Sequence, residues 1–375
     1  MNEGTRFRID DGRIDWVEAA GLVVTFEITK AFLVFPEKIA KEGLTAAWTI
    51  PLVSGLLASL FIWVLVVVSK AHPGMNLIQI TNYLAGPTVG FIAGVALYLY
   101  LMIIIVTGFR EVADVLITVY MPLTPLGFFL ASAYAVVFYV AFQNTETLAR
   151  ISVLTSTVVV GMAIILAALS IGRYNTDLVF PPLGPGLIPL FKKYGVRQSI
   201  YGEFLSLGMI AAYLREPRQV GKVAAVSLGI SIFTFTLVVL TCQMVFPIPS
   251  LLRVSAPFLR VARVIKLGRF FQRLDSLFVF VWLGVSLLQA AVAIYLASLV
   301  LATVFHLQSH KPFVVLNVVA AYFGSWAIPN LAAALTIAFD LARPYGLLLL
   351  DIWPPTLLVL TLHKKKQLRE GAGGA

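Results

Sequence analysis

The sequence predicts an all-helical protein that crosses a membrane about ten times, from its composition, its apolar runs and the placement of its charges. Of the 375 residues, 59% are hydrophobic and 12% are charged, and the mean hydropathy is +0.92. Soluble domains average about 45 to 50% apolar and about 25% charged residues, so a soluble fold is excluded. Disorder is excluded for the same reason, and the single cysteine, Cys242, excludes an internal disulfide.

Ten apolar runs have the length of a membrane-spanning helix. A bilayer core about 30 Å thick requires about 20 apolar residues per helix, and charges, prolines and glycines separate the runs. We therefore treat 1–375 as one membrane domain with a polar N-terminal segment at 1–15 and a basic C-terminal tail at 363–375. The predicted spans are 16–36, 44–69, 88–109, 124–142, 151–172, 198–214, 222–245, 275–304, 313–341 and 345–362.

The first and sixth runs are the weakest as continuous helices. The first carries Thr25, Glu27 and Lys30 near its middle, and the sixth is the shortest. Interrupted helices at matching places in two halves of five spans are typical of an inverted-repeat transporter, with ligand bound where helices one and six unwind. Sequence similarity between the halves is weak, so the order of spans carries this prediction.

Basic residues lie mostly between the apolar runs. A formal charge of +10 would suggest nucleic acid in a soluble chain, but here Lys and Arg are interfacial anchors, so we predict no nucleic-acid partner. In 251–273, basic residues recur at roughly helical spacing among apolar residues, namely Arg253, Arg260, Arg263, Lys266 and Arg269. This pattern predicts a helix lying in the membrane interface, with a solvated loop as the alternative. With that segment set aside, the charge count favours cytoplasmic termini.

The sequence contains no pattern typical of a soluble enzyme. The four histidines lie in loops or at span ends without a partner at metal-ligand spacing, and no phosphate-binding G-x-x-x-x-G-K motif occurs. Cys242 lies among apolar residues, as a small core residue would. We predict no enzymatic activity, no metal, no cofactor and no cleaved signal peptide.

Three charged residues fall well inside the predicted spans: Glu27, Lys30 and Glu203. Each costs about 2.5 to 3.5 kcal/mol at a helix centre, so they must be paired, neutral or hydrated. Two pairings are open. Glu27 and Lys30 are three residues apart on one helix and could pair locally, or Lys30 could reach Glu203 across the two interrupted helices.

The start of the sixth span is unusually polar. Gly202 permits a non-helical backbone, and exposed N–H groups at a half-helix terminus favour a carboxylate, which suits an amino-acid ligand. The alternative is an ordinary capped helix with a glycine for close packing. The polar residues concerned are Ser199, Tyr201, Glu203 and Ser206.

Several stretches resemble a known family. These are AHPGMNLIQITNYLAG, FREVADVLITVYMPLTP, NTETLARIS, SIYGEFLSLGMIAAYL, and FPIPSLLR with LGRFFQRLDSLFVFVWL. In this order, and over essentially the whole chain, they resemble the B subunit of spore germinant receptors. That is the GerAB-type spore permease branch of the amino acid, polyamine and organocation superfamily.

The resemblance implies a LeuT-like 5+5 inverted repeat with broken helices one and six, in the inner membrane of an endospore-forming bacterium. It also implies a small germinant, often an amino acid, and separate A- and C-type subunits. Lys30 and Ser206 join the candidate ligand site from the residue analysis. The residues implied by the resemblance are Val24, Thr25, Phe26, Glu27, Tyr98, Tyr201, Gly202, Glu203, Phe204, Leu205 and Ser286.

Two departures bear on the ligand and on coupling. Glu27 and Lys30 occupy helix one where a small uncharged segment is expected, which puts a simple amino acid such as alanine in doubt as the ligand. The fifth span lacks the Lys that replaces sodium in proton-coupled relatives, which puts proton-driven transport in doubt. The leading prediction is a germinant-sensing subunit, and the alternative is an ion-coupled amino-acid transporter with Glu203 as proton carrier, because fold alone does not choose.

Overall fold

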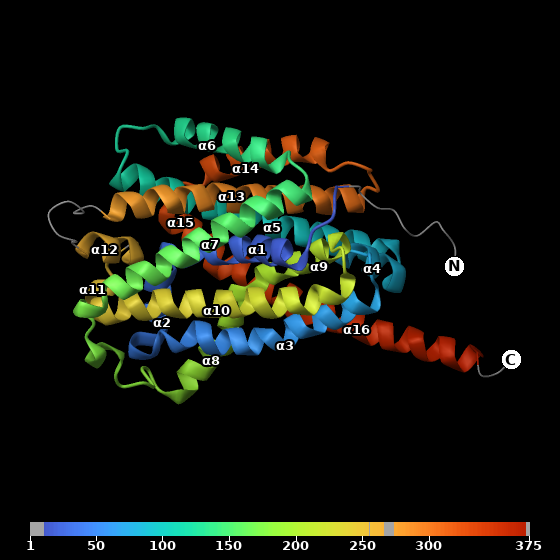
Figure 1. Cartoon of the computed structure of the whole chain (residues 1–375), viewed down its shortest axis with the longest axis horizontal. Coiled ribbons are helices and arrows are strands. Elements are labelled where there is room, and N and C mark those ends of the chain that lie inside the picture. Colours follow the sequence, from blue (N-terminus) through green and yellow to red (C-terminus); the bar gives the residue numbers. More distant parts are fainter. Residues whose placement is uncertain (1–10, 255, 266–273, 373–375) are drawn as a thin grey trace.

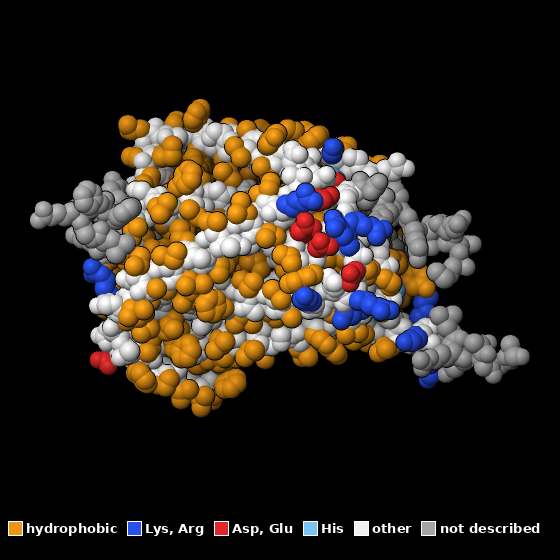
Figure 2. All heavy atoms as spheres, viewed as in Figure 1, with side chains coloured by type: hydrophobic (Ala, Val, Ile, Leu, Met, Phe, Trp, Pro, Cys, Tyr) orange, Lys and Arg blue, Asp and Glu red, His pale blue; other side chains and the backbone are white. Residues whose placement is uncertain are grey.

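The computed structural model describes residues 11–254, 256–265 and 274–372, nearly all of them helical. Most long helices run along the long axis of the molecule, with the end of α16 at one extremity and α11 and α12 at the other (Figure 1). Hydrophobic side chains cover most of the visible flank, and charged side chains gather toward the end where α16 finishes (Figure 2). An apolar flank with charge at one end suits a protein embedded in lipid, and the chain is an integral membrane protein.

Within the described residues, six helical stretches are long and apolar enough to cross a membrane, and a bent pair makes a seventh. The bent pair joins Trp16–Phe32 to Phe35–Ala46 at 68°. Three further predicted spans correspond to shorter elements, namely α6 (Leu126–Ala141), α14 (Lys311–Ala327) and a discontinuous stretch over 187–213. The six long stretches are Thr49–Ala71 (α3), Pro87–Val119 (α5), Thr145–Leu169 (α7), Pro217–Val245 (containing α10, Val220–Val245), Leu274–Val304 (α13) and Leu331–Gln367.

The first helix is broken, as predicted, but it extends further than predicted. α1 (Trp16–Ile28) packs against α7, α10 and α13, continues as the 3-10 turn η2 (Thr29–Phe32), and gives way to α2 (Phe35–Gly43). The predicted end at residue 36 was wrong because Pro36 lies in the first turn of α2. Proline is tolerated in the first turn of a helix, because the backbone N–H groups of that turn have no acceptor within the helix.

The sixth helix is discontinuous and begins earlier than predicted. α8 (Leu187–Arg197) leads into the seven-residue 3-10 segment η6 (Gln198–Phe204), then α9 (Leu205–Ile210) and η7 (Ala211–Tyr213). A 3-10 run of this length is uncommon and often marks a functional site. The predicted span began at residue 198, whereas α8 begins just after Gly186, at φ +104°.

The predicted boundary between spans nine and ten was wrong. It was placed near Arg343, but the chain breaks after α14, where Pro329 disfavours a helical Ile328 and leaves it extended. The Asn330 side chain then caps α15 (Leu331–Thr336) by accepting the Ala333 N–H at 2.9 Å. The π-helical turn η9 (Ile337–Ala342) runs directly into α16 (Arg343–Ala372), which includes most of the predicted C-terminal tail.

Two connecting segments form short helices. α4 (Leu77–Ala85) lies between α3 and α5 and begins with a capping box on Asn76. α11 (Ile248–Leu251) ends where the basic segment 251–273 begins, and within that segment α12 (Pro257–Val264) buries its apolar face and exposes Arg260 and Arg263. Residues 255 and 266–273 of that segment lie outside the described residues. The interfacial position of the segment stays a prediction.

Candidate functional site

The three charges predicted inside the membrane spans meet in one cluster. The Lys30 Nζ lies 2.9 Å from Glu27 Oε1 and 2.7 Å from Glu203 Oε2, so both pairings left open by the sequence occur together. The same ammonium donates to the Ile200 carbonyl at 2.5 Å, and that carbonyl belongs to η6. Lys30 therefore ties the break in helix one to the 3-10 segment of helix six.

Sequence reasoning missed the fourth member, Arg343. Its Nη1 donates to Glu203 Oε1 at 2.6 Å, and its side chain is buried. Two carboxylates and two cations make the cluster formally neutral. The predicted spans 313–341 and 345–362 left Arg343 in the connection between them, where a charge carries little cost.

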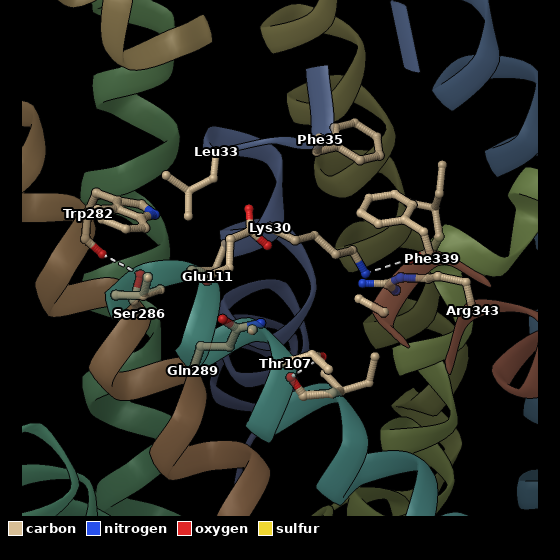
Figure 3. Close-up of a pocket in the computed structure, with 16 residues that line it drawn as sticks. Lys30, Leu33, Phe35, Thr107, Glu111, Trp282, Ser286, Gln289, Phe339 and Arg343 are labelled. Atoms are coloured by element: carbon tan, nitrogen blue, oxygen red, sulfur yellow. Dashed lines mark hydrogen bonds between the residues drawn. The ribbon is translucent and has the colours of Figure 1, made fainter. Parts of the chain in front are cut away.

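A cavity of about 50 Å³ lies beside this cluster (Figure 3). A water molecule needs about 10 to 15 Å³ measured in this way, so the space holds a few waters, and a larger ligand requires side-chain movement. Its polar lining comes from Thr29, Lys30, Thr107, Glu111, Ser286, Gln289 and Arg343, and its apolar lining includes Leu33, Phe35, Ile104, Trp282 and Phe339.

Side chains on one face of α13 and on one face of α5 line two sides of the cavity. On α13, Trp282, Ser286 and Gln289 are separated by four and three residues, so they share one face. On α5, Thr107 and Glu111 share a face in the same way. Glu111 was missed because the predicted third span ended at residue 109, whereas α5 continues to Val119.

Opposite charges face one another across the cavity. Lys30 and Arg343 converge on one side, Trp282 and Ser286 lie on the other, and the Glu111 carboxylate lies between them (Figure 3). Glu111 Oε1 accepts the Val34 N–H at 3.1 Å, which satisfies a donor freed by the break in helix one. Gln289 donates a hydrogen bond to the Phe26 carbonyl at 3.2 Å, which holds the end of α1 on the N-terminal side of the break.

The predicted ligand-binding residues divide into three groups, all within the described chain. Lys30 and Ser286 line the cavity, and Glu27 and Glu203 lie in the adjacent cluster. The other predicted residues do not line it. Thr25, Tyr98 and Tyr201 donate to Ser152 O, Asn317 Oδ1 and Pro51 O, and Val24, Phe26, Gly202, Phe204, Leu205 and Ser206 are buried in packing around the breaks.

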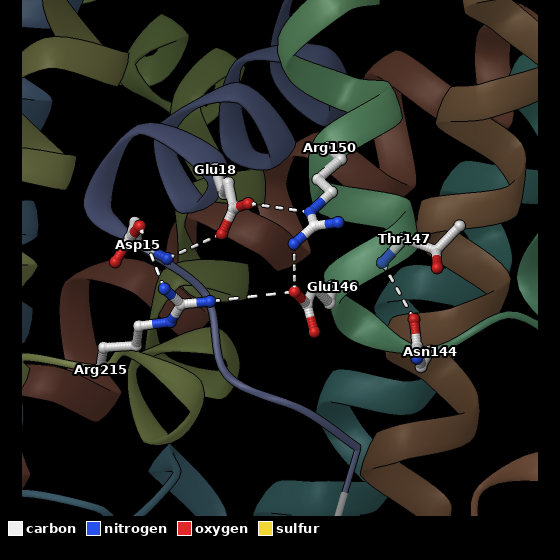
Figure 4. Close-up of polar contacts among 7 residues, drawn as sticks. All are labelled: Asp15, Glu18, Asn144, Glu146, Thr147, Arg150 and Arg215. Carbon is white, nitrogen blue, oxygen red and sulfur yellow. Dashed lines mark hydrogen bonds and ion pairs between the residues drawn. The ribbon is translucent and has the colours of Figure 1, made fainter.

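The ends of both broken helices are joined near the charged end of the molecule. Ile14, before α1, donates its N–H to the Tyr213 carbonyl at 3.0 Å, and Arg215 N donates to Ile14 O at 3.0 Å. An ion-pair network surrounds this link (Figure 4). Its pairs are Asp15 with Arg215 (3.5 Å), Arg215 with Glu146 (3.8 Å), Arg150 with Glu18 (3.3 Å), and Arg150 with Glu146.

Comparisons with known proteins agree with this architecture. A family model described as spore germination protein matches residues 13–330. Spore germination protein YndE of Bacillus subtilis (strain 168) is 17% identical over 297 residues, which cover 78% of this chain and 81% of the relative. Spore germination protein KB of the same organism is 23% identical over 279 residues, or 72% of this chain and 73% of the relative.

Two solved structures have the same fold. Mhp1, a nucleobase-cation-symport-1 family transporter in a closed conformation with bromovinylhydantoin bound, superposes with a TM-score of 0.62 at 14% identity, covering 92% of this chain and 80% of Mhp1. MhsT in complex with L-phenylalanine gives 0.61 at 13% identity, covering 94% and 99%. At these identities the likeness concerns the fold, which confirms the LeuT-like inverted repeat. The chain therefore belongs to the spore germination protein family of membrane permeases.

Proposed function

We propose that the chain is the germinant-sensing subunit of a spore germination receptor in the inner spore membrane. Membership of the family supports a role in germinant sensing or transport. The proposed ligand is a small amino-acid-like molecule bound between α1 with η2, α5, η6 with α9, and α13. One observation carries the proposal, namely a cavity at the helix breaks in which Arg343 and Lys30 face Glu111.

The cavity suits a ligand that carries both charges. The Nη1 of Arg343 donates a hydrogen bond to Glu203. A guanidinium has five N–H donors, so the remaining N–H groups of Arg343 can bind a ligand carboxylate. Glu111 uses Oε1 for Val34 and can accept an ammonium at Oε2. Trp282 and Phe339 offer an apolar surface for a ligand side chain. An amino acid matches these three features.

A ligand bound in this cavity would contact groups that connect both broken helices. η2 and η6 meet at Lys30, and Glu111 holds the turn after η2, so a ligand that moves these groups changes the bend of helix one. We propose that separate A- and C-type receptor subunits receive this change and trigger germination.

An ion-coupled transporter with Glu203 as proton carrier is the alternative. The transporter folds of Mhp1 and MhsT favour it. The contacts of Glu203 count against it as carrier, because Lys30 and Arg343 occupy its two oxygens and a proton could bind only after one pair breaks. Uptake of radiolabelled germinant into vesicles containing the chain distinguishes the two. The sensor predicts no uptake above empty vesicles.

Filling the cavity tests the sensor directly. Gly108 lines the cavity, and a Cβ added there meets no atom within 4 Å, so Gly108→Leu starts its side chain in open space and should fill the cavity. Spores with Gly108→Leu should lose the germinant response while the protein accumulates normally. Gly161→Leu on α7 is the matched control, because a Cβ there also meets open space, away from the cavity. An unchanged germinant concentration dependence in Gly108→Leu spores places the ligand elsewhere.

A further inference from the structure

We infer that the Lys30 ammonium is the tethered occupant of a monovalent-cation site formed by Glu27, Glu203 and the Ile200 carbonyl. The site would take a small monovalent cation, such as potassium or an alkylammonium ion, if the tether were absent. It concerns how the two broken helices are held together, and it does not depend on which ligand binds in the cavity, although Lys30 also lines that cavity.

The contacts of Lys30 form a cation shell. Its Nζ has three oxygen neighbours, at 2.9 Å in Glu27, 2.7 Å in Glu203 and 2.5 Å in the Ile200 carbonyl. A lysine ammonium has three donors; within the described chain its contact with the Ile200 carbonyl is a hydrogen bond, and the two carboxylate oxygens lie at ion-pair distance. Carboxylate and carbonyl oxygens are also the ligands that hard cations prefer. The Phe235 ring, 5.5 Å from Nζ, adds a favourable face for a cation.

The charge count fixes how many cations the site holds. If all four groups are ionised, Glu27 and Glu203 carry two negative charges, which the two positive charges of Lys30 and Arg343 balance. Arg343 is engaged with Glu203 Oε1 at 2.6 Å, and within the described chain Lys30 is the cation at ion-pair distance from Glu27. Removal of the Lys30 charge therefore leaves a buried deficit of one positive charge. One monovalent ion restores neutrality.

One further carboxylate oxygen is placed where it could contact a bound cation. Glu27 is fully buried, and its Oε2 has no hydrogen-bond partner in the part of the chain that the structure describes. A free ion is not constrained by a side-chain tether, so it could shift toward this oxygen and gain a contact that Nζ does not make. With Lys30 in place, the chain supplies its own cation, and the stability of the native protein should not depend on sodium or potassium.

The experiment uses the purified full chain in detergent at constant ionic strength, with choline chloride as the balancing salt. The thermal unfolding midpoint Tm is measured against methylammonium chloride and potassium chloride. Lys30→Ala empties the tether position, so its Tm should start below the wild-type value and rise saturably with either ion. The wild-type Tm should not change.

Three further variants make the test specific. Lys30→Met fills the same space with an apolar chain and should not respond. The double variant Lys30→Ala with Glu203→Gln loses one carboxylate that would bind the cation, and it loses the charge deficit. Its apparent Kd for the added cation should therefore rise at least tenfold. Lys30→Arg keeps a tethered cation and should fold without added ions. A Tm shift of equal size in wild type and Lys30→Ala, or no shift in Lys30→Ala, overturns the inference.

If Lys30→Ala does not accumulate in choline, it is expressed and purified in methylammonium and then exchanged into choline. Unfolding on exchange, reversed by methylammonium, supports the site. Failure to accumulate in methylammonium or potassium, while Lys30→Arg accumulates normally, overturns it.

Discussion

At the scale of residues, the cost of buried charge made part of the cluster predictable. Glu27, Lys30 and Glu203 are conspicuous in apolar runs, and a buried charge needs a partner, so the sequence predicted that they interact. It could not show that Lys30 contacts both carboxylates, because that depends on where two distant helices break. Arg343 and Glu111 were missed because each lies beyond a span end that the sequence misplaced.

Removing Lys30 should expose how the cluster is coupled. Lys30→Met leaves uncompensated carboxylates and should lower the free energy of unfolding by about 3 to 5 kcal/mol. Adding Glu27→Gln should recover more stability than adding Glu203→Gln, because the second change leaves Arg343 without its carboxylate. Unfolding of the detergent-solubilised single and double variants measures this. Strict additivity in both double variants would mean that the residues are not coupled.

At the scale of elements, the existence of the two broken helices was predictable and their bounds were not. Polar residues within an apolar run indicated both breaks. Proline was misleading in both directions, because Pro36 lies inside the first turn of α2 while Pro329 marks a real break within a predicted span. Whether a proline ends a helix depends on the position of the freed carbonyls and their partners, which sequence spacing alone does not give.

The close approach of helix six to α5 gives a sharp test of packing. A Cβ on Gly202 would lie 2.7 Å from the Tyr100 hydroxyl oxygen but 3.5 Å from the ring carbon that bears it. Gly202→Ala should therefore destabilise the protein by about 1 to 3 kcal/mol through overpacking. Tyr100→Phe in the same chain should restore most of the loss, as seen in Tm. Equal Tm values for Gly202→Ala with and without Tyr100→Phe would contradict this packing.

The exposed arginines of α12 should serve association and not ligand choice. α12 lies at the end of the molecule opposite the end of α16 (Figure 1), and its residues Arg260 and Arg263 do not line the cavity. Arg260→Gln with Arg263→Gln should weaken binding to anionic vesicles or to partner subunits, in sedimentation and co-purification assays. The order of preference among germinants should stay the same. A changed order would place this segment in the ligand site.

At the scale of the whole molecule, the architecture was predictable because it rests on the number and order of apolar runs. The small size of the cavity was not, since it results from contacts between residues far apart in the chain. Ile14 pairs with the chain around Tyr213, and the ion pairs of Arg150 and Arg215 tie both broken helices to α7.

Ligand-dependent stabilisation of the purified chain tests the central claim most directly. Each proteinogenic amino acid is added to wild type, Gly108→Leu and Gly161→Leu, and Tm is recorded against concentration. A ligand that binds the native state stabilises it by about 2.7 kcal/mol at 100 times its Kd. We predict saturable stabilisation of wild type and Gly161→Leu by at least one amino acid, and none of Gly108→Leu. Equal stabilisation of Gly108→Leu, or no stabilisation of wild type by any amino acid, would contradict a germinant site at the helix breaks.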